Sequence, residues 1–380
     1  MTLVEQKVDV RSDRLEQQPV SGPFRNRLKE LDALRGIAAI SVMLFHYTSI
    51  YPDFFPEHRN IGVRFDAGGY GVFLFFGISG FVISRTLENT AGIADFTIKR
   101  VARLFPAYWA AVLITTLVVQ WSGTERLQAE FETILINLTM LQGFFFVPSV
   151  DGVYWTLTVE LAFYICAALA WMARRRVRIE YLLSGWMAVG AIASVSEIAP
   201  YRVQMLLVNQ YSPFFAIGVL TYRAWSAQRR YLDQLPYFAM ALAILSFNGG
   251  AAFLIAGVGI QVMLWLAING RLSAITHPIL LYLGALSYPL YLIHHHAGFV
   301  LLRAIDRAQI GPFAGVIVTS ATMLGLAALL HHSIEAPAER AIRTWWLRRL
   351  RARFKSFSGV AIPCGSADEH ADRSDHSPGG

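Results

Sequence analysis

Long apolar runs separated by short charged clusters dominate the hydrophobic pattern of this chain. Runs long enough to cross a bilayer as a helix, roughly 17–25 residues, recur between residues 31 and 334. The pattern predicts an all-α polytopic membrane protein with about ten transmembrane helices. We place them at residues 31–51, 70–87, 104–121, 154–173, 181–197, 205–222, 235–248, 250–268, 279–301 and 313–334.

Two stretches leave the number of spans open. Asn248-Gly249-Gly250 is a turn signal between two runs, but the first run is short, so about nine or eleven spans are alternatives. Residues 134–147, between the third and fourth spans, are typical of a segment that lies at the membrane interface. We therefore expect an external loop there.

Composition agrees with a membrane protein. Hydrophobic residues make up 55% of the chain and charged residues 16%, against about 25% charged residues in a typical soluble domain. Two cysteines, Cys166 within an apolar run and Cys364 in a polar tail, offer neither a disulfide framework nor a metal site. The composition excludes a single soluble core, and we expect no metal and no tightly bound cofactor.

Lysine and arginine collect on the cytoplasmic side of membrane proteins. If the amino terminus is inside, six of the 33 lysines and arginines fall on external loops, Arg35 falls within the first span and 26 are inside. We therefore expect both termini in the cytoplasm. The net charge of +7 follows from this topology and from contact with anionic membrane lipids, so we expect no nucleic acid partner.

The two ends of the chain differ from its middle. Residues 1–30 are polar and carry no secretory signal, so we expect a cytoplasmic tail ahead of a ten-span membrane domain at 31–335. Residues 336–355 combine many arginines with two tryptophans, a composition typical of a basic interfacial helix. Residues 356–380 are rich in Ser, Gly, Asp and His, and we expect a disordered cytoplasmic tail.

The first span carries two ionisable side chains, Arg35 and His46, that a purely structural helix does not need. Their spacing places them about 20° apart around the helix and about 16.5 Å apart in depth. They therefore share one face, with the arginine near the cytoplasm and the histidine in the outer half. The alternative, in which Arg35 snorkels to the headgroups and His46 is a packing residue, has equal weight from spacing alone.

Other ionisable residues lie in the same outer half. Glu160 lies about 9 Å below the outer start of the fourth span. The ninth run ends, about 22 Å from its start, in His294, His295 and His296. A cavity lined by His46, Glu160 and one of these histidines would supply a base and a carboxylate to orient it, as needed to deprotonate a hydroxyl. The same groups suit a proton relay in a transporter.

A basic cluster precedes the third span. Arg100 and Arg103 are three residues apart, so on a helix they share a face and can grip phosphates together, with Arg35 at the same level. Topology alone also explains such a cluster. In the second span, Ser79 lies near mid-depth among glycines whose expected role is helix packing.

Six motifs follow one another along the chain. They are LDALRGIAAISVMLFHY, GVFLFFGISGFVIS, FTIKRVARLFPAYW, VYWTLTVELAFYI, LGALSYPLYLIHH and HHSIEAPAER, and they cover residues 31–340. In this order they resemble the acyltransferase 3 family of bacterial membrane O-acyltransferases. The resemblance implies ten spans in the bacterial cytoplasmic membrane, acyl groups drawn from cytosolic acyl-CoA, and transfer to hydroxyls of envelope glycans, lipid-linked sugars or secreted small molecules.

The resemblance also assigns roles to the residues already noted. The family's functional residues fall on Arg35 and His46 in the first span, Arg100 and Arg103 before the third, Glu160 in the fourth and His294 in the ninth. Two positions depart from the family pattern. Phe73 stands where the family often has aspartate, and His295-His296 replaces the usual Trp-Pro, so the resemblance does not carry over the kink at this point, and three histidines compete for one role.

These features predict a membrane O-acyltransferase that moves an acyl group, with acetyl expected, from acyl-CoA to a glycan or glycolipid hydroxyl. Arg35, Arg100 and Arg103 would bind the donor phosphates. His46 would act as general base, oriented by Glu160, while Ser79 or helix dipoles would steady the oxyanion. Direct transfer and an acyl-histidine intermediate both stay open.

The alternative function is a transporter that moves a glycan, a metabolite or protons through the same polar cavity. The chain shows no internal repeat and no paired broken spans of the kind that transporters use, which favours the acyltransferase. The sequence does not identify the acceptor, and it indicates no oligomeric state.

Overall fold

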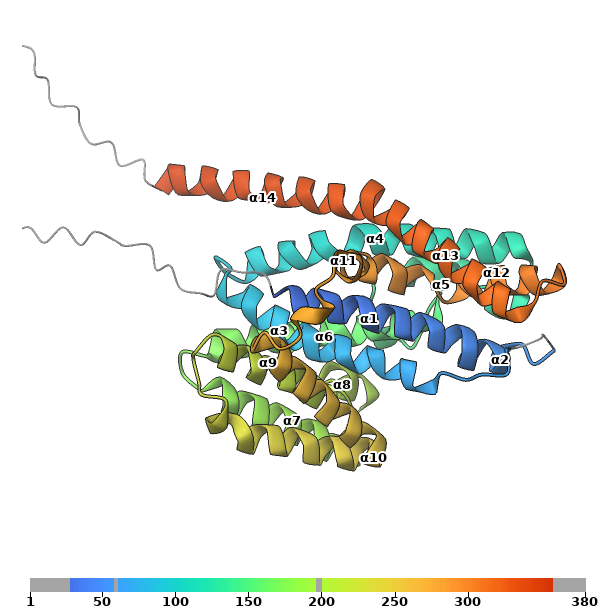
Figure 1. The fold of residues 1–380 in the computed structure, drawn as a ribbon. Coiled ribbons are helices and arrows are strands. Elements are labelled where there is room, and N and C mark those ends of the chain that lie inside the picture. Colours follow the sequence, from blue (N-terminus) through green and yellow to red (C-terminus); the bar gives the residue numbers. More distant parts are fainter. Residues whose placement is uncertain (1–27, 58–60, 196–199, 358–380) are drawn as a thin grey trace, which may run out of the picture.

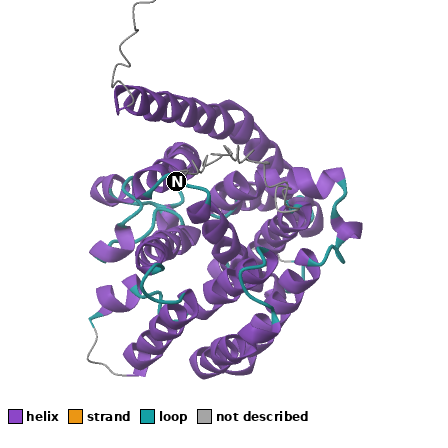
Figure 2. Cartoon of the chain, turned by 90° about the vertical axis from the view of Figure 1, so that its left-hand side faces the viewer, coloured by secondary structure: helices purple, strands orange, loops and turns teal. Residues whose placement is uncertain are grey.

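The computed structural model describes residues 28–57, 61–195 and 200–357. Within these ranges the chain consists of helices and loops, with no strand (Figures 1 and 2). The tails predicted at 1–30 and 356–380 lie almost wholly outside the described residues, so their predicted character stays a prediction.

The helices follow one another with short connections. In chain order they are α1 (Lys29–Phe45), η2 (His46–Ile50), α2 (Tyr51–Phe54), η3 (Asp66–Tyr70), α3 (Gly71–Glu88), α4 (Ile93–Ser122), η4 (Glu125–Leu127), α5 (Phe131–Asn137), η5 (Gln142–Phe145), η6 (Gly152–Tyr154), α6 (Trp155–Ala173), α7 (Ile179–Val195), α8 (Tyr201–Leu206), α9 (Ser212–Trp225), η7 (Leu232–Gln234), α10 (Leu235–Ile268), η8 (Ser273–Ile275), α11 (Pro278–Ile293), α12 (His296–Arg307), α13 (Pro312–Leu330), η9 (His331–Glu335) and α14 (Ala336–Phe357). Segments η2 and η9 are π-helical, and the other η segments are 3-10 turns.

Six helical stretches of the described chain are long and apolar enough to cross a membrane. Four of them contain the first four predicted spans, and the other two contain α10 and the joined α13 and α14. Helices α7 and α11 are apolar but shorter. The predicted span at 205–222 is divided between α8 and α9. The count of ten spans therefore stays a prediction.

Helix α10 contains the predicted turn. Gly249 and Gly250 have non-helical dihedral angles, and Gly250 has a φ of 61°, which favours glycine. Beyond this point the chain folds back on itself, because Gly257 packs against the side chains of Leu242 and Leu245. The two runs predicted at 235–248 and 250–268 are thus two packed helical segments.

The predicted ninth span is broken where the sequence offers no proline. Helix α11 ends at Ile293, and α12 begins at His296, with His295 between them at φ −80° and ψ −82°. The sequence expectation of a continuous span over 279–301 is therefore wrong. Polar contacts to the exposed backbone, described below, take the place of a proline.

Helix α14 begins at Ala336, where the basic interfacial helix was predicted, but it continues α13 through the π-turn η9. It runs beside the first half of α4 (Figure 1). There the indole N–H of Trp346 donates to Asp95 at 3.0 Å. Its position at a membrane surface stays a prediction. The start of α1 and the end of α14 lie at the same end of the molecule (Figure 1), an arrangement that an even number of crossings gives.

Two pairs of helices approach each other closely at glycines. A Cβ built at Gly36 of α1 would lie 2.7 Å from the backbone nitrogen of Gly284 in α11, and one at Gly284 would lie 2.0 Å from the backbone oxygen of Asp32. Helices α3 and α9 meet in the same way at Gly80 and Gly218. Small residues at helix contacts let backbones approach closely in a membrane, where dispersion rather than hydrophobic burial holds helices together.

Replacing Gly80 by alanine should separate α3 from α9, because the new Cβ would lie 2.1 Å from the backbone oxygen of Phe215. We expect the variant to lose about 1–3 kcal/mol of stability, seen as a lower midpoint of thermal unfolding in detergent. Gly259→Ala is the matched control, because its Cβ would enter open space. Equal midpoints for the two variants would contradict the close contact.

Candidate active site

His46 and His294 meet across the contact between α1 and α11. The Nε2 atom of His294 lies 3.1 Å from Nδ1 of His46. The same Nδ1 lies 2.8 Å from the backbone oxygen of Val42. His294 is buried, while His46 is partly exposed. The predicted association of these two histidines is therefore present.

Carbonyl partners define which nitrogen of each ring carries the proton. A carbonyl oxygen only accepts, so Nδ1 of His46 must donate to Val42 and Nε2 is left with a lone pair. His294 has its Nδ1 within 2.9 Å of the backbone oxygen of Tyr291, so its Nε2 also carries a lone pair. The His46 N–H is shared between Val42 and His294. His46 thereby presents an unprotonated Nε2, the form that a general base requires.

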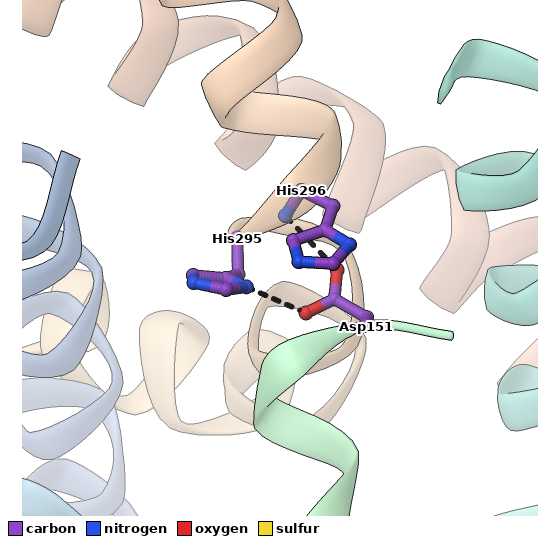
Figure 3. Close-up of side chains that lie close together, drawn as sticks. All are labelled: Asp151, His295 and His296. Atoms are coloured by element: carbon purple, nitrogen blue, oxygen red, sulfur yellow. Dashed lines mark hydrogen bonds and ion pairs between the residues drawn. The ribbon is translucent and has the colours of Figure 1, made fainter. Parts of the chain in front are cut away.

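A second polar group surrounds the break between α11 and α12 (Figure 3). Nδ1 of His295 donates to Oδ1 of Asp151 at 2.8 Å, and the backbone N–H of His296 donates to Oδ2 at 2.9 Å. The Val153 N–H also donates to Oδ1, at 3.2 Å. All of Asp151, His295 and His296 are buried. Sequence reasoning missed Asp151, which lies just before η6 with no periodic pattern to mark it.

The protonation of Asp151 follows from these contacts. Burial alone raises the pKa of this carboxyl group, but the imidazoles of His296 and His295 and the backbone N–H of His296 outweigh it. The pKa of Asp151 therefore lies below its ordinary range. Asp151 is a buried anion at neutral pH.

Glu160 lies elsewhere than predicted. Its Oε1 accepts hydrogen bonds from Ser79 Oγ at 2.9 Å and from the Tyr164 hydroxyl at 2.6 Å. Among the described residues it has no hydrogen bond to His46. The structure thus brings His294, not Glu160, to the predicted base. The single hydroxyl proton of Ser79 is engaged by Glu160, so in this geometry it does not serve as the predicted oxyanion donor.

A cavity of about 470 Å³ lies between these histidines and the start of α1, where Asp32 and Arg35 line it. Its volume is within the range of about 300–1,000 Å³ typical of small-molecule sites. Helices α1, α3, α4, α6 and α11 and the junction of α13 with α14 form its wall. Its polar lining contains Asp32, Arg35, Ser79, Arg100, Arg103, Thr156, Glu160, Tyr164, Ser287, Tyr288, Tyr291, His331, Glu339 and Arg343. Five predicted site residues therefore line one cavity.

The arginines of this cavity are not equivalent. Arg103 pairs with the buried Glu335 and lies 3.5 Å from Glu339. By contrast, Arg35 and Arg100 form no ion pair with any described carboxylate, and the buried Nε of Arg100 has no hydrogen-bond partner there. Sequence reasoning missed both glutamates, which lie more than 230 positions from Arg103 along the chain.

Tyr291 connects the cavity with the histidines. Its side chain lines the cavity, its hydroxyl lies 2.8 Å from the hydroxyl of Thr156, and its ring centroid lies 5.7 Å from that of His294. The cavity therefore reaches Tyr291, the neighbour of His294, although neither His294 nor His46 is among the residues that line it.

Long apolar helices that enclose a polar cavity define a multi-helix protein of the membrane type. A family model described as an acyltransferase domain matches residues 28–332. The chain belongs to this family, acyltransferase 3.

Three proteins with names are similar in sequence to this chain. The chain is 28% identical to nodulation protein 10 of Rhizobium leguminosarum bv. viciae, over 74% of this chain and 84% of that protein. It is 28% identical to the exopolysaccharide production protein ExoZ of Rhizobium meliloti (strain 1021), over 79% and 96% respectively. It is 29% identical to an O-acetyl transferase of Shigella phage Sf6, over 44% and 53%. No solved structure matches the chain significantly.

Replacing Tyr47 by phenylalanine tests the broken end of α11. The Tyr47 hydroxyl donates to the backbone oxygen of His294 at 2.7 Å, and its loss leaves a buried acceptor without that donor. We expect about 1–3 kcal/mol of destabilisation, measured by thermal unfolding in detergent. Tyr181→Phe is the control, because this side chain is 55% exposed. An unchanged midpoint for Tyr47→Phe would contradict the assigned contact.

Proposed function

We propose that this protein is an acyl-CoA-dependent membrane O-acyltransferase. It moves an acyl group, most simply acetyl, from cytosolic acyl-CoA to a hydroxyl of an envelope or secreted glycan or glycolipid. The observation that carries the proposal is the bare Nε2 of His46, fixed by Val42 and His294 next to a cavity that contains arginines at its far end.

The donor enters through the arginine end of the cavity. Arg35 and Arg100 have no carboxylate partner among the described residues, so they are available for the phosphates of coenzyme A. Arg103 already pairs with Glu335, and it contributes positive charge rather than a free guanidinium. The extended pantetheine arm then carries the thioester past Tyr291 towards His46.

Transfer needs one base. Nε2 of His46 takes the proton of the acceptor hydroxyl, the oxygen attacks the thioester carbon, and the carbon–sulfur bond breaks. His46 then returns the proton to the sulfur of coenzyme A, which balances the reaction. His294 holds the Nδ1 proton of His46 throughout, the orienting role that the sequence assigned to Glu160. An acyl-histidine intermediate at the same Nε2 is the variant that trapping experiments distinguish.

The names of relatives support the class of acceptor. One relative is named an O-acetyl transferase, another is named for exopolysaccharide production, and a third, from Bacillus subtilis (strain 168), is named a putative peptidoglycan O-acetyltransferase. A glycan acceptor outside the cytoplasmic membrane fits an enzyme with both termini inside. The family also favours acyl transfer over the transporter that the sequence left as an alternative.

Mass spectrometry of envelope and secreted glycans from a deletion strain tests this function. We expect a glycan to lose the mass of one acyl group and to regain it when the gene is restored. A glycan profile that is unchanged by deletion would count against acyl transfer and in favour of a transporter.

His46→Ala should abolish most of the transfer, because a general base contributes about 10²- to 10⁴-fold. The measurement is the rate of acyl transfer from radiolabelled acetyl-CoA to envelope glycan in inverted membrane vesicles. His332→Ala, at an exposed histidine outside the cavity, is the control and should keep the wild-type rate. A wild-type rate for His46→Ala would remove His46 from the chemistry.

Arg100→Ala should weaken donor binding with less effect on the chemical step. Loss of a charge-assisted hydrogen bond of about 1.5–3 kcal/mol corresponds to a rise in KM for acetyl-CoA of roughly 10- to 100-fold. Arg271→Ala is matched in residue type but lies outside the cavity, and its KM should not change. Equal KM values for both variants would place the donor elsewhere.

A further inference from the structure

The carboxylate of Asp151 accepts three hydrogen bonds from N–H groups of the protein. It accepts from the His295 ring, the His296 backbone and the Val153 backbone. The remaining ring of the group, that of His296, donates from Nδ1 to the backbone oxygen of Val150 at 3.0 Å. Although Asp151, His295 and His296 lie close enough together to hold a metal ion, these bonds satisfy the carboxylate without one. The group is complete as a hydrogen-bonded unit.

His295 links this unit to the base. Its ring centroid lies 4.5 Å from that of His46, in an edge-to-face arrangement. Figure 3 shows one ring nitrogen of His295 directed at Asp151 and the other directed away from it, towards α1. Because Nδ1 carries the proton, the nitrogen on the side of α1 carries a lone pair, and the negative end of the ring dipole faces the helix of His46.

His295 does not itself reach the substrate. It is only 4% exposed, and its ring is enclosed by His46, His296 and Phe299, with centroids 4.5–4.7 Å away. His46 is the more exposed of the two rings. Any contribution of His295 to the reaction must therefore act through His46.

We propose that Asp151 and His295 form a positioning dyad that stabilises the positive charge which His46 acquires when it takes the hydroxyl proton. This inference rests on the proposed function and adds two residues to it. Asp151 supplies a buried negative charge, and His295, which is hydrogen-bonded to it, lies in edge-to-face contact with the His46 ring. Neither residue exchanges a proton with the substrate.

The dyad acts on His46 through the electrostatic field of the Asp151 carboxylate. A buried anion acts over several ångströms, because low-dielectric surroundings screen it weakly. The titratable groups that face His46 are His294 and His295 from the broken end of α11 and Asp151 from the loop before η6. Among these groups Asp151 is the carboxylate. No second carboxylate of the described residues faces His46 from these elements.

The pH dependence of the transfer rate tests the dyad. Asp151→Asn removes the charge, and His295→Phe keeps a ring in the same cage but removes its polarity and its bond to Asp151. In each variant we expect kcat to fall about tenfold and the acid limb of the pH–rate profile to move by about one unit to lower pH. The direction follows because His46 becomes harder to protonate once the nearby negative charge is weakened.

His296→Phe is the matched control. It makes the same change at the next residue, whose backbone bond to Asp151 survives while His295 stays in place, and its acid limb should move less than that of His295→Phe. Two variants at different positions keep the test valid if one of them fails to fold, as judged by gel filtration in detergent. An unmoved acid limb in a folded Asp151→Asn or His295→Phe protein would overturn the inference and leave the group a structural one.

Two further measurements separate the competing explanations. Stoichiometric zinc or another metal in the purified wild-type protein, lost in Asp151→Asn, would overturn the dyad in favour of a metal site. If the wild type transfers no acyl group, or His46→Ala transfers normally, the proposed function fails. If both behave as proposed and only the acid limbs stay fixed, the dyad alone fails.

Discussion

The close approach of α1 and α11 at Gly36 and Gly284 is the constraint on which the site depends. At this point a Cβ on either residue would collide with the backbone of the other helix. The two helices run in parallel, and each has a histidine ten residues beyond its glycine, at positions 46 and 294. Equal rise along two helices in contact brings the two rings to one level. The histidine pair is thus a consequence of backbone packing about 15 Å away along the helices.

The break after His294 is stabilised by polar groups of neighbouring elements. A helix that ends inside a membrane protein exposes carbonyl groups, and each must find a donor because lipid offers none. The hydroxyl of Tyr47 binds the carbonyl of His294, and that of Tyr154 binds the carbonyl of Leu292 at 3.0 Å. Asp151 caps the following helix by accepting the His296 N–H. The contacts that stabilise the end of α11 therefore also hold a carboxylate close to His295, the ring next to His46.

Local signals made much of this fold predictable. The glycine pair at 249 and 250 marked a fold-back that depends only on neighbouring dihedral angles, and periodicity placed Arg35 and His46 on one face of the first helix. The motif order identified the family. The association of His46 with His294 was predictable because each lies directly after a regular helix along which depth can be counted.

The remaining contacts depend on which helices pack together, and no local pattern encodes that choice. Glu160 and His46 were expected at similar depth, but α6 turns its carboxylate towards Ser79 of α3 instead. The continuous ninth span was predicted because no proline occurs at 296, whereas tyrosines on other helices stabilise the break. Asp151 lies in a loop, where depth cannot be counted from helical rise.

The carboxylates of the cavity explain how its arginines are tolerated without a ligand. Buried unpaired cations are costly in a low-dielectric wall, and four arginines, Arg35, Arg100, Arg103 and Arg343, line the cavity. Glu339 pairs with Arg343 at 2.8 Å and lies near Arg103, while Glu335 binds Arg103 directly. The contacts of Arg103 join α4 to η9 and α14, the Glu339–Arg343 pair lies within α14, and together they neutralise half of the positive set. Arg35 and Arg100 form no ion pair with a described carboxylate, so their charge is balanced only across the cavity, where Asp32 and Glu160 also line the wall.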